Sequence, residues 1–281
     1  MKYTVSALFL AMIFFISGCK DNTEQGHQLV KLWESDSVLK VPESVLFDAA
    51  ANVLYVSNID GADAWGNDST GSIGKLSTDG KVIEVDWVSG LSAPKGLGMF
   101  DGKLYVADLT DLVVINIDSA KIEKRIPVPG AVGLNDVAVS STGDIYISDS
   151  KDKKVFAVKN GMPELYLENL SAPNGVLVYN GSVYVLDNGG LYKVNEDKTL
   201  MKLADGMECN ADGVENLHGN EFIVSCWEGV IWHISEDGTK QILLDGREQE
   251  IRSADIGIDA NKGIIYVPTF WRNTVAAYQV N

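Results

Sequence analysis

The sequence is short of cysteine, of histidine and of positive charge. Its 281 residues include 3 cysteines and 3 histidines, and 23 Lys and Arg stand against 39 Asp and Glu, which gives a formal net charge of -16 at pH 7. This balance argues against a nucleic-acid-binding protein and against adhesion to anionic membrane surfaces, because both need patches of Lys and Arg. It is compatible with a soluble body and with a site for a cation.

The few thiols and imidazoles restrict the chemistry further. Cys209 and Cys226 fall within one repeat, where they form either a disulfide or two isolated buried thiols. Neither has a histidine beside it in the sequence, so neither is predicted to be a nucleophile. His27 lies in a polar tether, His218 at a hairpin turn and His233 in an outer strand, and we interpret each of them as structural or solvated.

Long hydrophobic runs are also lacking, since the main one extends only from Val5 to Ile16. A run of this length is too short to span a bilayer comfortably and indicates an export signal. The following Ser17-Gly18-Cys19 resembles the end of a bacterial lipobox, which implies removal of residues 1–18 and lipidation of Cys19; an ordinary signal peptide with a chance cysteine is the alternative. We therefore expect a polar tether over residues 19–27 and a membrane anchor in the bacterial cell envelope, at the outer membrane facing the periplasm or the surface.

A short pattern is present six times: a polar residue, an apolar run, a turn and a second run rich in Tyr, Ile and Val. The polar residues that open the six copies, at intervals of 52, 40, 39, 38 and 43 residues, are Glu43, Lys95, Asn135, Asn174, Asp212 and Asp255. A period near 40 with four short strands per unit is typical of a β-propeller. No linker divides residues 28–281, so we predict one all-β domain, a six-bladed propeller of four-stranded antiparallel blades.

Two departures from regular repetition have structural meaning. The sixth repeat lacks a fourth strand-like run, and the segment Gln28–Trp33 is predicted to supply it and to close the ring, which removes an exposed sheet edge. The first repeat carries extra residues between its second and third strands, over residues 58–71. This loop is either a lid with Trp65 as an apolar wall or a tolerated surface insertion.

The inner strands of a propeller converge on one axis, so the six polar residues are predicted to form a ring that is a candidate site. Glu43, Asn135, Asn174 and Asp212 offer carboxylate and amide oxygens, which suit calcium, magnesium or manganese. Zinc is less favoured, because no histidine or cysteine lies on the ring.

The triplets Leu134-Asn135-Asp136, Pro173-Asn174-Gly175 and Ala211-Asp212-Gly213 resemble motifs of the senescence marker protein, gluconolactonase and luciferin-regenerating enzyme-like family. The resemblance covers residues 41–281. It implies a six-bladed propeller that holds one divalent cation, commonly calcium, and hydrolyses lactones or phosphotriester-like substrates. It also implies roles for particular residues: the metal ligands would be Glu43, Asn135, Asn174 and Asp212, and the catalytic residues Asp212 and Asn135. The candidate substrate-pocket residues come from their positions instead, Lys95 and Asp255 on the ring and Trp65 in the long loop.

Two features favour a different interpretation. The first repeat has Pro42-Glu43-Ser44-Val45 where the family usually shows Glu-Gly-Pro, and the Lys95 ammonium group can neutralise Glu43 and Asp212. A network of ion pairs at the axis would then replace the metal. With the ring as such an ion-pair network, or as a structural metal site, the protein is a non-catalytic lipoprotein that binds a glycan, a small molecule or a protein. A pyrroloquinoline-quinone sugar dehydrogenase is a third alternative, which the absence of histidine from the ring disfavours.

Overall fold

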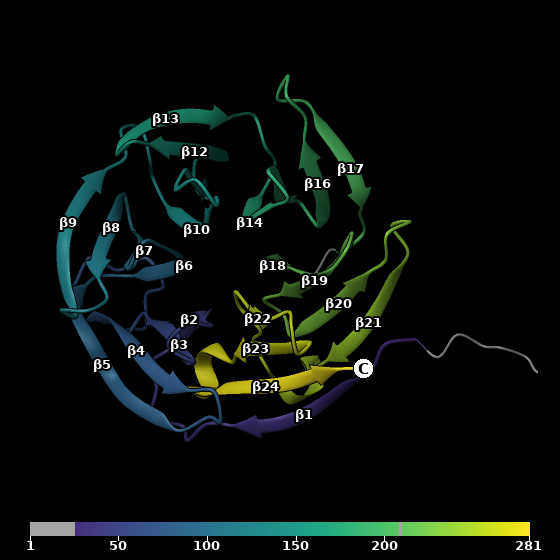
Figure 1. Ribbon diagram of the computed structural model, residues 1–281, viewed down its shortest axis with the longest axis horizontal. Coiled ribbons are helices and arrows are strands. Elements are labelled where there is room, and N and C mark those ends of the chain that lie inside the picture. Colours follow the sequence, from purple (N-terminus) through teal and green to yellow (C-terminus); the bar gives the residue numbers. More distant parts are fainter. Residues whose placement is uncertain (1–25, 208–209) are drawn as a thin grey trace, which may run out of the picture.

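A computed structural model describes residues 26–207 and 210–281 of the chain. These residues form six four-stranded antiparallel sheets arranged around a central axis (Figure 1). The predicted six-bladed β-propeller is therefore confirmed. Two short 3-10 helices, η1 (Arg247–Gln249) and η2 (Phe270–Arg272), interrupt the strands, and within the described ranges no helix is long and apolar enough to cross a membrane.

Blades 1 to 5 follow the chain from the inside outward. Blade 1 contains β2 (Pro42–Asp48), β3 (Val53–Asn58), β4 (Gly71–Ser77) and β5 (Val82–Leu91). Blade 2 contains β6 (Pro94–Phe100), β7 (Lys103–Asp108), β8 (Asp111–Asn116) and β9 (Lys121–Pro127). Blade 3 contains β10 (Leu134–Val139), β11 (Ile145–Asp149), β12 (Lys154–Lys159) and β13 (Met162–Leu167). Blade 4 contains β14 (Pro173–Tyr179), β15 (Ser182–Asp187), β16 (Gly190–Val194) and β17 (Leu200–Ala204), and blade 5 contains β18 (Ala211–His218), β19 (Glu221–Cys226), β20 (Val230–Ile234) and β21 (Lys240–Asp245).

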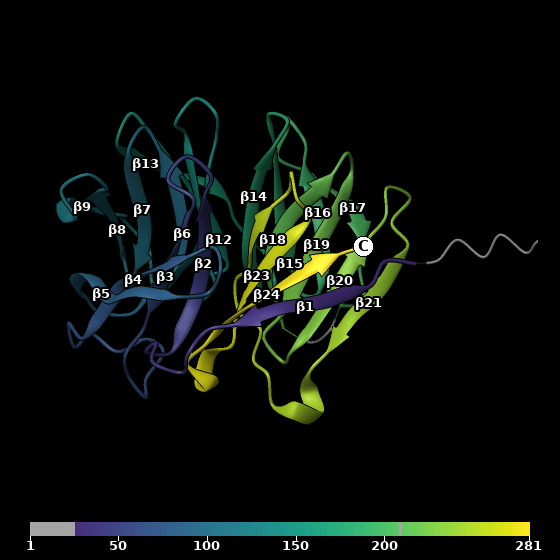
Figure 2. The same ribbon diagram turned by 60° about the horizontal axis from the view of Figure 1, so that its bottom comes forward.

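The sixth blade combines both ends of the described chain. Its inner strands are β22 (Gly257–Asp259), β23 (Ile264–Pro268) and β24 (Val275–Val280), and its outermost strand is β1 (Leu29–Glu34). Strand β1 runs antiparallel to β24, with Leu29 opposite Val280 (Figure 2). The predicted closure by the N-terminal strand is correct, and the strand begins one residue later than expected.

The hydrophobic core lies between the blades rather than within them. Each of six large clusters of buried apolar side chains joins two neighbouring blades; one of them packs Tyr55 and Ile73 of blade 1 against Leu97 and Leu104 of blade 2. The sixth blade packs in this way against blade 5 on one face and blade 1 on the other, so completing it keeps both faces covered. This is the physical reason for the pairing of β1 with β24.

Most blades share an irregularity of strand pairing at the ring residues. In blades 2 to 5 the two innermost strands are not paired at two positions, namely the ring residue and the residue that follows it. The residue after the ring residue is glycine in three of these blades. A Cβ atom on one of them, Gly96, would lie only 2.5 Å from Cα of Asp136 in the next blade. Adjacent inner strands therefore approach each other closely at the candidate site.

Several sequence predictions concern residues outside the described ranges. These predictions are the signal peptide, the lipidation of Cys19 and most of the tether, and they stay predictions. Cys209 also lies outside the described ranges. Cys226 is buried at the end of β19 and is disulfide-bonded. Of the two states considered for this cysteine, the isolated thiol is therefore wrong.

Candidate functional site

The six predicted ring residues lie at the same relative position in their blades. Five of them are the second residue of an inner strand, and the sixth precedes β22 by two residues; in chain order they are Glu43, Lys95, Asn135, Asn174, Asp212 and Asp255. All except Asn174 are buried. The backbone N–H of Asp255 donates to the carbonyl oxygen of Glu43 over 2.9 Å, which joins the last blade to the first at this end of the axis.

The ring residues make separate pairwise contacts. The Lys95 Nζ atom lies 3.7 Å from Oε1 of Glu43, and both side chains are almost fully buried. On the opposite side, Nδ2 of Asn174 donates to Oδ1 of Asp212 over 2.8 Å. The ring thus contains an ion pair and an amide–carboxylate pair. The remaining two ring residues contact serines: Asn135 donates to Ser150 Oγ over 3.0 Å, and Asp255 accepts from Ser44 Oγ.

Two buried oxygen atoms of the ring lack a hydrogen-bond partner among the described residues. They are Oε2 of Glu43 and Oδ1 of Asn174, both predicted as metal ligands. A buried polar atom without a partner costs about 1–3 kcal/mol, so such atoms are rare in native structures unless a ligand or water completes them. Carboxylate and amide oxygens are the donors that calcium, magnesium and manganese prefer, so these residues fit a hard divalent cation.

The electrostatics of the ring also favour added positive charge. Burial raises the pKa of Glu43, against the opposing effect of Lys95. Burial likewise raises the pKa of Asp212 well above its usual value, and the Glu43 carboxylate adds to the rise. Asp255 behaves in the same way, through burial and the carboxylate of Asp136. A cation near these groups would stabilise their ionised forms.

Two further acids line the channel below the ring. A cavity of about 220 Å³ follows the inner strands and includes Asp136 and Glu215. Burial raises the pKa of Asp136 to about 7 although it accepts hydrogen bonds from the backbone of Val137 and Val176. Burial raises the pKa of Glu215 to about 8, with a smaller contribution from Asp136. Sequence reasoning missed Glu215, because it stands beside the polar Asn216 in β18 and two adjacent polar residues give no signal of a buried acid.

Replacing Glu215 with Gln should stabilise the protein at high pH. The folded state favours neutral Glu215, so the stabilising effect is complete below the unfolded pKa of about 4.3 and is lost as pH rises through about 8. We expect Glu215→Gln to raise the melting temperature by roughly 5 °C at pH 9, since each pKa unit corresponds to about 1.4 kcal/mol and each kcal/mol to roughly 2–4 °C, with partial exposure reducing the effect. Near pH 4 the two proteins should melt together. The exposed Glu196→Gln is the control, and an equal shift in that variant would contradict the assignment.

The long loop of blade 1 lies beside the ring. The Nζ atoms of Lys95 and Lys151 are each 4.4 Å from the centre of the Trp65 ring, on which they make cation–π contacts. A Cβ atom on Gly133 would come within 2.9 Å of the same indole. The structure thus places Trp65 next to Lys95, and the role of this loop as a lid stays a prediction.

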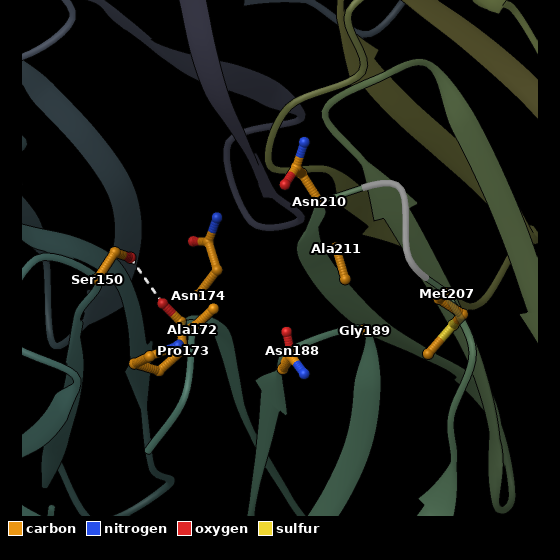
Figure 3. Close-up of a pocket in the computed structure, with 9 residues that line it drawn as sticks. All are labelled: Ser150, Ala172, Pro173, Asn174, Asn188, Gly189, Met207, Asn210 and Ala211. Atoms are coloured by element: carbon orange, nitrogen blue, oxygen red, sulfur yellow. Dashed lines mark hydrogen bonds between the residues drawn. The ribbon is translucent and has the colours of Figure 1, made fainter. Parts of the chain in front are cut away.

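A pocket of about 480 Å³ opens next to Asn174, between blades 4 and 5 (Figure 3). Asn188, Asn210 and Met207 lie around it together with Ser150, whose hydroxyl donates to the carbonyl oxygen of Pro173 over 2.7 Å. Sequence reasoning did not find this pocket, because its lining comes from the loops that follow several different strands. It is large enough for a small ligand that also contacts the ring.

All three histidines of the chain gather at another place, around one carboxylate. The Nε2 atoms of His233, His218 and His27 lie 2.9, 3.4 and 3.6 Å from Oε2 of Glu221. Among the described residues, His27, Glu221 and His233 are the one group of three His, Cys, Asp or Glu close enough to share a metal ion. The interpretation of three separate histidines did not anticipate this, since no motif spacing links residue 27 with blade 5.

Comparison with known proteins supports the fold. No protein-family model matches the sequence, and no curated protein matches it either. A streptogramin B lyase structure matches 91% of this chain and 98% of its own, with a TM-score of 0.67 and 12% identity. A protein assigned as a gluconolactonase matches 92% of this chain and 93% of its own, with a TM-score of 0.67 and 15% identity. A chain of a nidogen–laminin complex matches 78% and 84%, with a TM-score of 0.65 and 17% identity.

These similarities define a class of architecture. The chain is a six-bladed β-propeller that resembles gluconolactonase and streptogramin B lyase structures. At this level of identity the likeness concerns the fold alone, and propellers support many functions. The function must therefore be inferred from the residues at the axis.

Proposed function

We propose that the protein is a divalent-cation-dependent hydrolase of lactones or related esters, with its active site at the polar end of the propeller axis. The observation that carries the proposal is the pair of buried, unpartnered oxygen atoms on Glu43 and Asn174, next to Asp212. The structural likeness to a gluconolactonase is consistent with this reaction class. Calcium suits the oxygen donors best, and magnesium or manganese are the other candidates.

In this proposal Glu43, Asn135, Asn174 and Asp212 hold the cation. When bound, a divalent cation polarises a carbonyl group and lowers the pKa of water. The Asp212 carboxylate lies within the ring, beside the amide of Asn174, and can take the proton of the attacking water as a general base. The oxygen of that water bonds to the ester carbon, the ring carbon–oxygen bond breaks, and the proton passes from Asp212 to the departing alkoxide.

The remaining residues orient the substrate. Asn135 is held by Ser150, and Ser150 also borders the pocket beside Asn174, so a substrate in the pocket is within reach of both amides. In this proposal Trp65, whose indole lies against Lys95 of the ring, covers the substrate from the blade 1 loop and limits the access of water. A cyclic ester of a small sugar acid matches a pocket of about 480 Å³ that is rich in amide groups.

One observation favours the non-catalytic alternative. The ion pair between Lys95 and Glu43 places a positive charge at the ring without any metal. If that ion pair takes the place of a metal ion in the ring, the propeller is a binding protein for a glycan, a small molecule or a protein. The hydrolase must both bind a cation and hydrolyse a lactone, whereas the binding protein hydrolyses none.

The test is thermal unfolding and lactone hydrolysis after chelator treatment, followed by addition of calcium, magnesium or manganese. We expect one cation to raise the melting temperature by roughly 5–10 °C, because a ligand at 100 times its Kd stabilises by about 2.7 kcal/mol and each kcal/mol corresponds to roughly 2–4 °C. Hydrolysis of a sugar-acid δ-lactone should disappear with chelator and return with that cation. Glu43→Gln should remove both effects.

Lys95→Met separates the two functions. In a hydrolase, wild type and variant both bind the cation, and the variant binds more tightly because a like charge has been removed. In the ion-pair alternative, only Lys95→Met gains cation binding and neither protein hydrolyses lactones. Failure of every cation to stabilise the wild type would therefore end the hydrolase proposal.

A further inference from the structure

We propose that His27, His218, Glu221 and His233 form a zinc site that fastens the start of the propeller to blade 5. The site is independent of the proposed hydrolase function. Its ligands are three imidazoles and one carboxylate, a set that suits zinc and differs from the oxygen donors at the axis.

Two of the three nitrogen–oxygen separations match the geometry of zinc, and the third, between His233 and Glu221, is a hydrogen bond that metal binding would replace. Ligand atoms about 2.0–2.2 Å from a tetrahedral zinc ion lie about 3.3–3.6 Å from one another. The three Nε2 atoms lie 2.9, 3.4 and 3.6 Å from the same oxygen, Oε2 of Glu221. The ligand atoms of His27, Glu221 and His233 are all within 4.8 Å of one another, and the mostly exposed ring of His218 can rotate to supply the fourth.

The second ring nitrogen of His27 supports the assignment. Its Nδ1 atom lies 3.1 Å from the carbonyl oxygen of Asn281, which can only accept, so Nδ1 carries the proton. The Nε2 atom is then the unprotonated nitrogen, and it faces Glu221. Metal-bound histidines usually donate their other N–H in this way, which fixes the ring and selects the free nitrogen.

The ligands are held by neighbouring strands and can be reached from solvent. Gln241 of β21 donates to the carbonyl oxygen of His27 over 2.7 Å, and His233 is buried in β20. An open surface hollow of about 830 Å³ adjoins the cluster and also includes the acids Glu236 and Asp237. A cation can therefore reach the ligands from solvent through a region of negative charge.

The consequence of zinc binding is mechanical. His27 precedes β1, the outermost strand of blade 6, whereas the other three ligands belong to β18–β20 of blade 5 or their connections. A metal ion bound to all four residues links the strand that closes the ring to the neighbouring blade. The metal would thereby stabilise the closed ring in addition to the hydrogen bonds between β1 and β24.

The experiment uses chelator-treated protein with zinc, and with cobalt(II) as a spectroscopic probe. We expect one zinc ion per chain at this site, the intense visible absorption of tetrahedral cobalt, and slower hydrogen exchange in β1 when zinc is present. His27→Gln should weaken zinc binding at least 100-fold and His218→Gln at least 10-fold. Glu236→Gln, which changes an acid in the same hollow, should alter the affinity less than about threefold.

Three results would overturn the proposal: no zinc bound, octahedral cobalt absorption, or unchanged zinc affinity in His27→Gln. Glu43→Gln keeps the assignment separate from the axial site, since zinc affinity at the histidines should survive that change. Because the cobalt spectrum is measured on the wild-type protein, it remains informative even if a histidine variant folds poorly.

Discussion

Asp212→Asn is expected to reduce lactone hydrolysis at least 100-fold while leaving the propeller folded. The asparagine keeps an oxygen that can accept the hydrogen bond from Asn174, so the local contact survives. It lacks the negative charge that binds a cation and the basic oxygen that takes a proton from water. The measurement is kcat and KM for the lactone at saturating cation, together with the cation affinity.

The stability of Asp212→Asn shows whether the Asp212 carboxylate serves function or stabilises the fold. The raised pKa of Asp212 means that the folded state favours its neutral form, so stability is lost as pH rises through that pKa. Metal-free Asp212→Asn should therefore be no less stable than wild type at pH 8. Activity that falls with no loss of stability supports the proposed role, whereas turnover above a third of wild type would contradict it. The exposed Asp118→Asn is the matched control.

The fold and the ring could be predicted because both depend on repetition. Each repeat carries its own strand and turn signals, so the same position in six copies must reach the same end of the axis. The closing strand followed from the missing fourth run of the last repeat. The structure confirms the blades and the β1–β24 pairing, and it places Glu43, Lys95 and Asp212 where the repeat positions put them.

The remaining features depend on contacts that repetition does not encode. The pairing of Lys95 with Glu43 rather than Asp212 depends on side-chain placement within the ring. The histidine cluster joins residue 27 to blade 5 only because β1 completes blade 6 beside it. Local spacing rules find metal sites whose ligands share one segment, so they miss ligands that ring closure brings together.

A repeated aspartate helps to explain how the loops around the site are held. The second strand ends in Asp108, Asp149 or Asp187 in blades 2, 3 and 4, and each carboxylate accepts backbone N–H groups from the segment that enters its inner strand. Asp149 is fully buried and accepts four, from residues 132, 133, 151 and 152. It precedes Ser150, which holds Asn135 and the carbonyl oxygen of Pro173, so this carboxylate connects the stability of blade 3 with the geometry of the site.

Asp149→Ala is expected to lower the free energy of unfolding by roughly 3–5 kcal/mol, because four N–H groups lose their acceptor and each unsatisfied buried group costs about 1–3 kcal/mol, with water recovering part of the loss. The melting temperature should fall by about 10 °C. Asp149→Asn should cost less, since Oδ1 accepts three of the four N–H groups and an asparagine keeps one such oxygen. Asp118→Ala, which removes an exposed carboxylate, should change stability by less than about 0.5 kcal/mol. If Asp149→Ala unfolded at the same denaturant concentration as Asp118→Ala, the four hydrogen bonds would contribute nothing to stability, and the entry segment of β10 would have to be held by its apolar contacts alone.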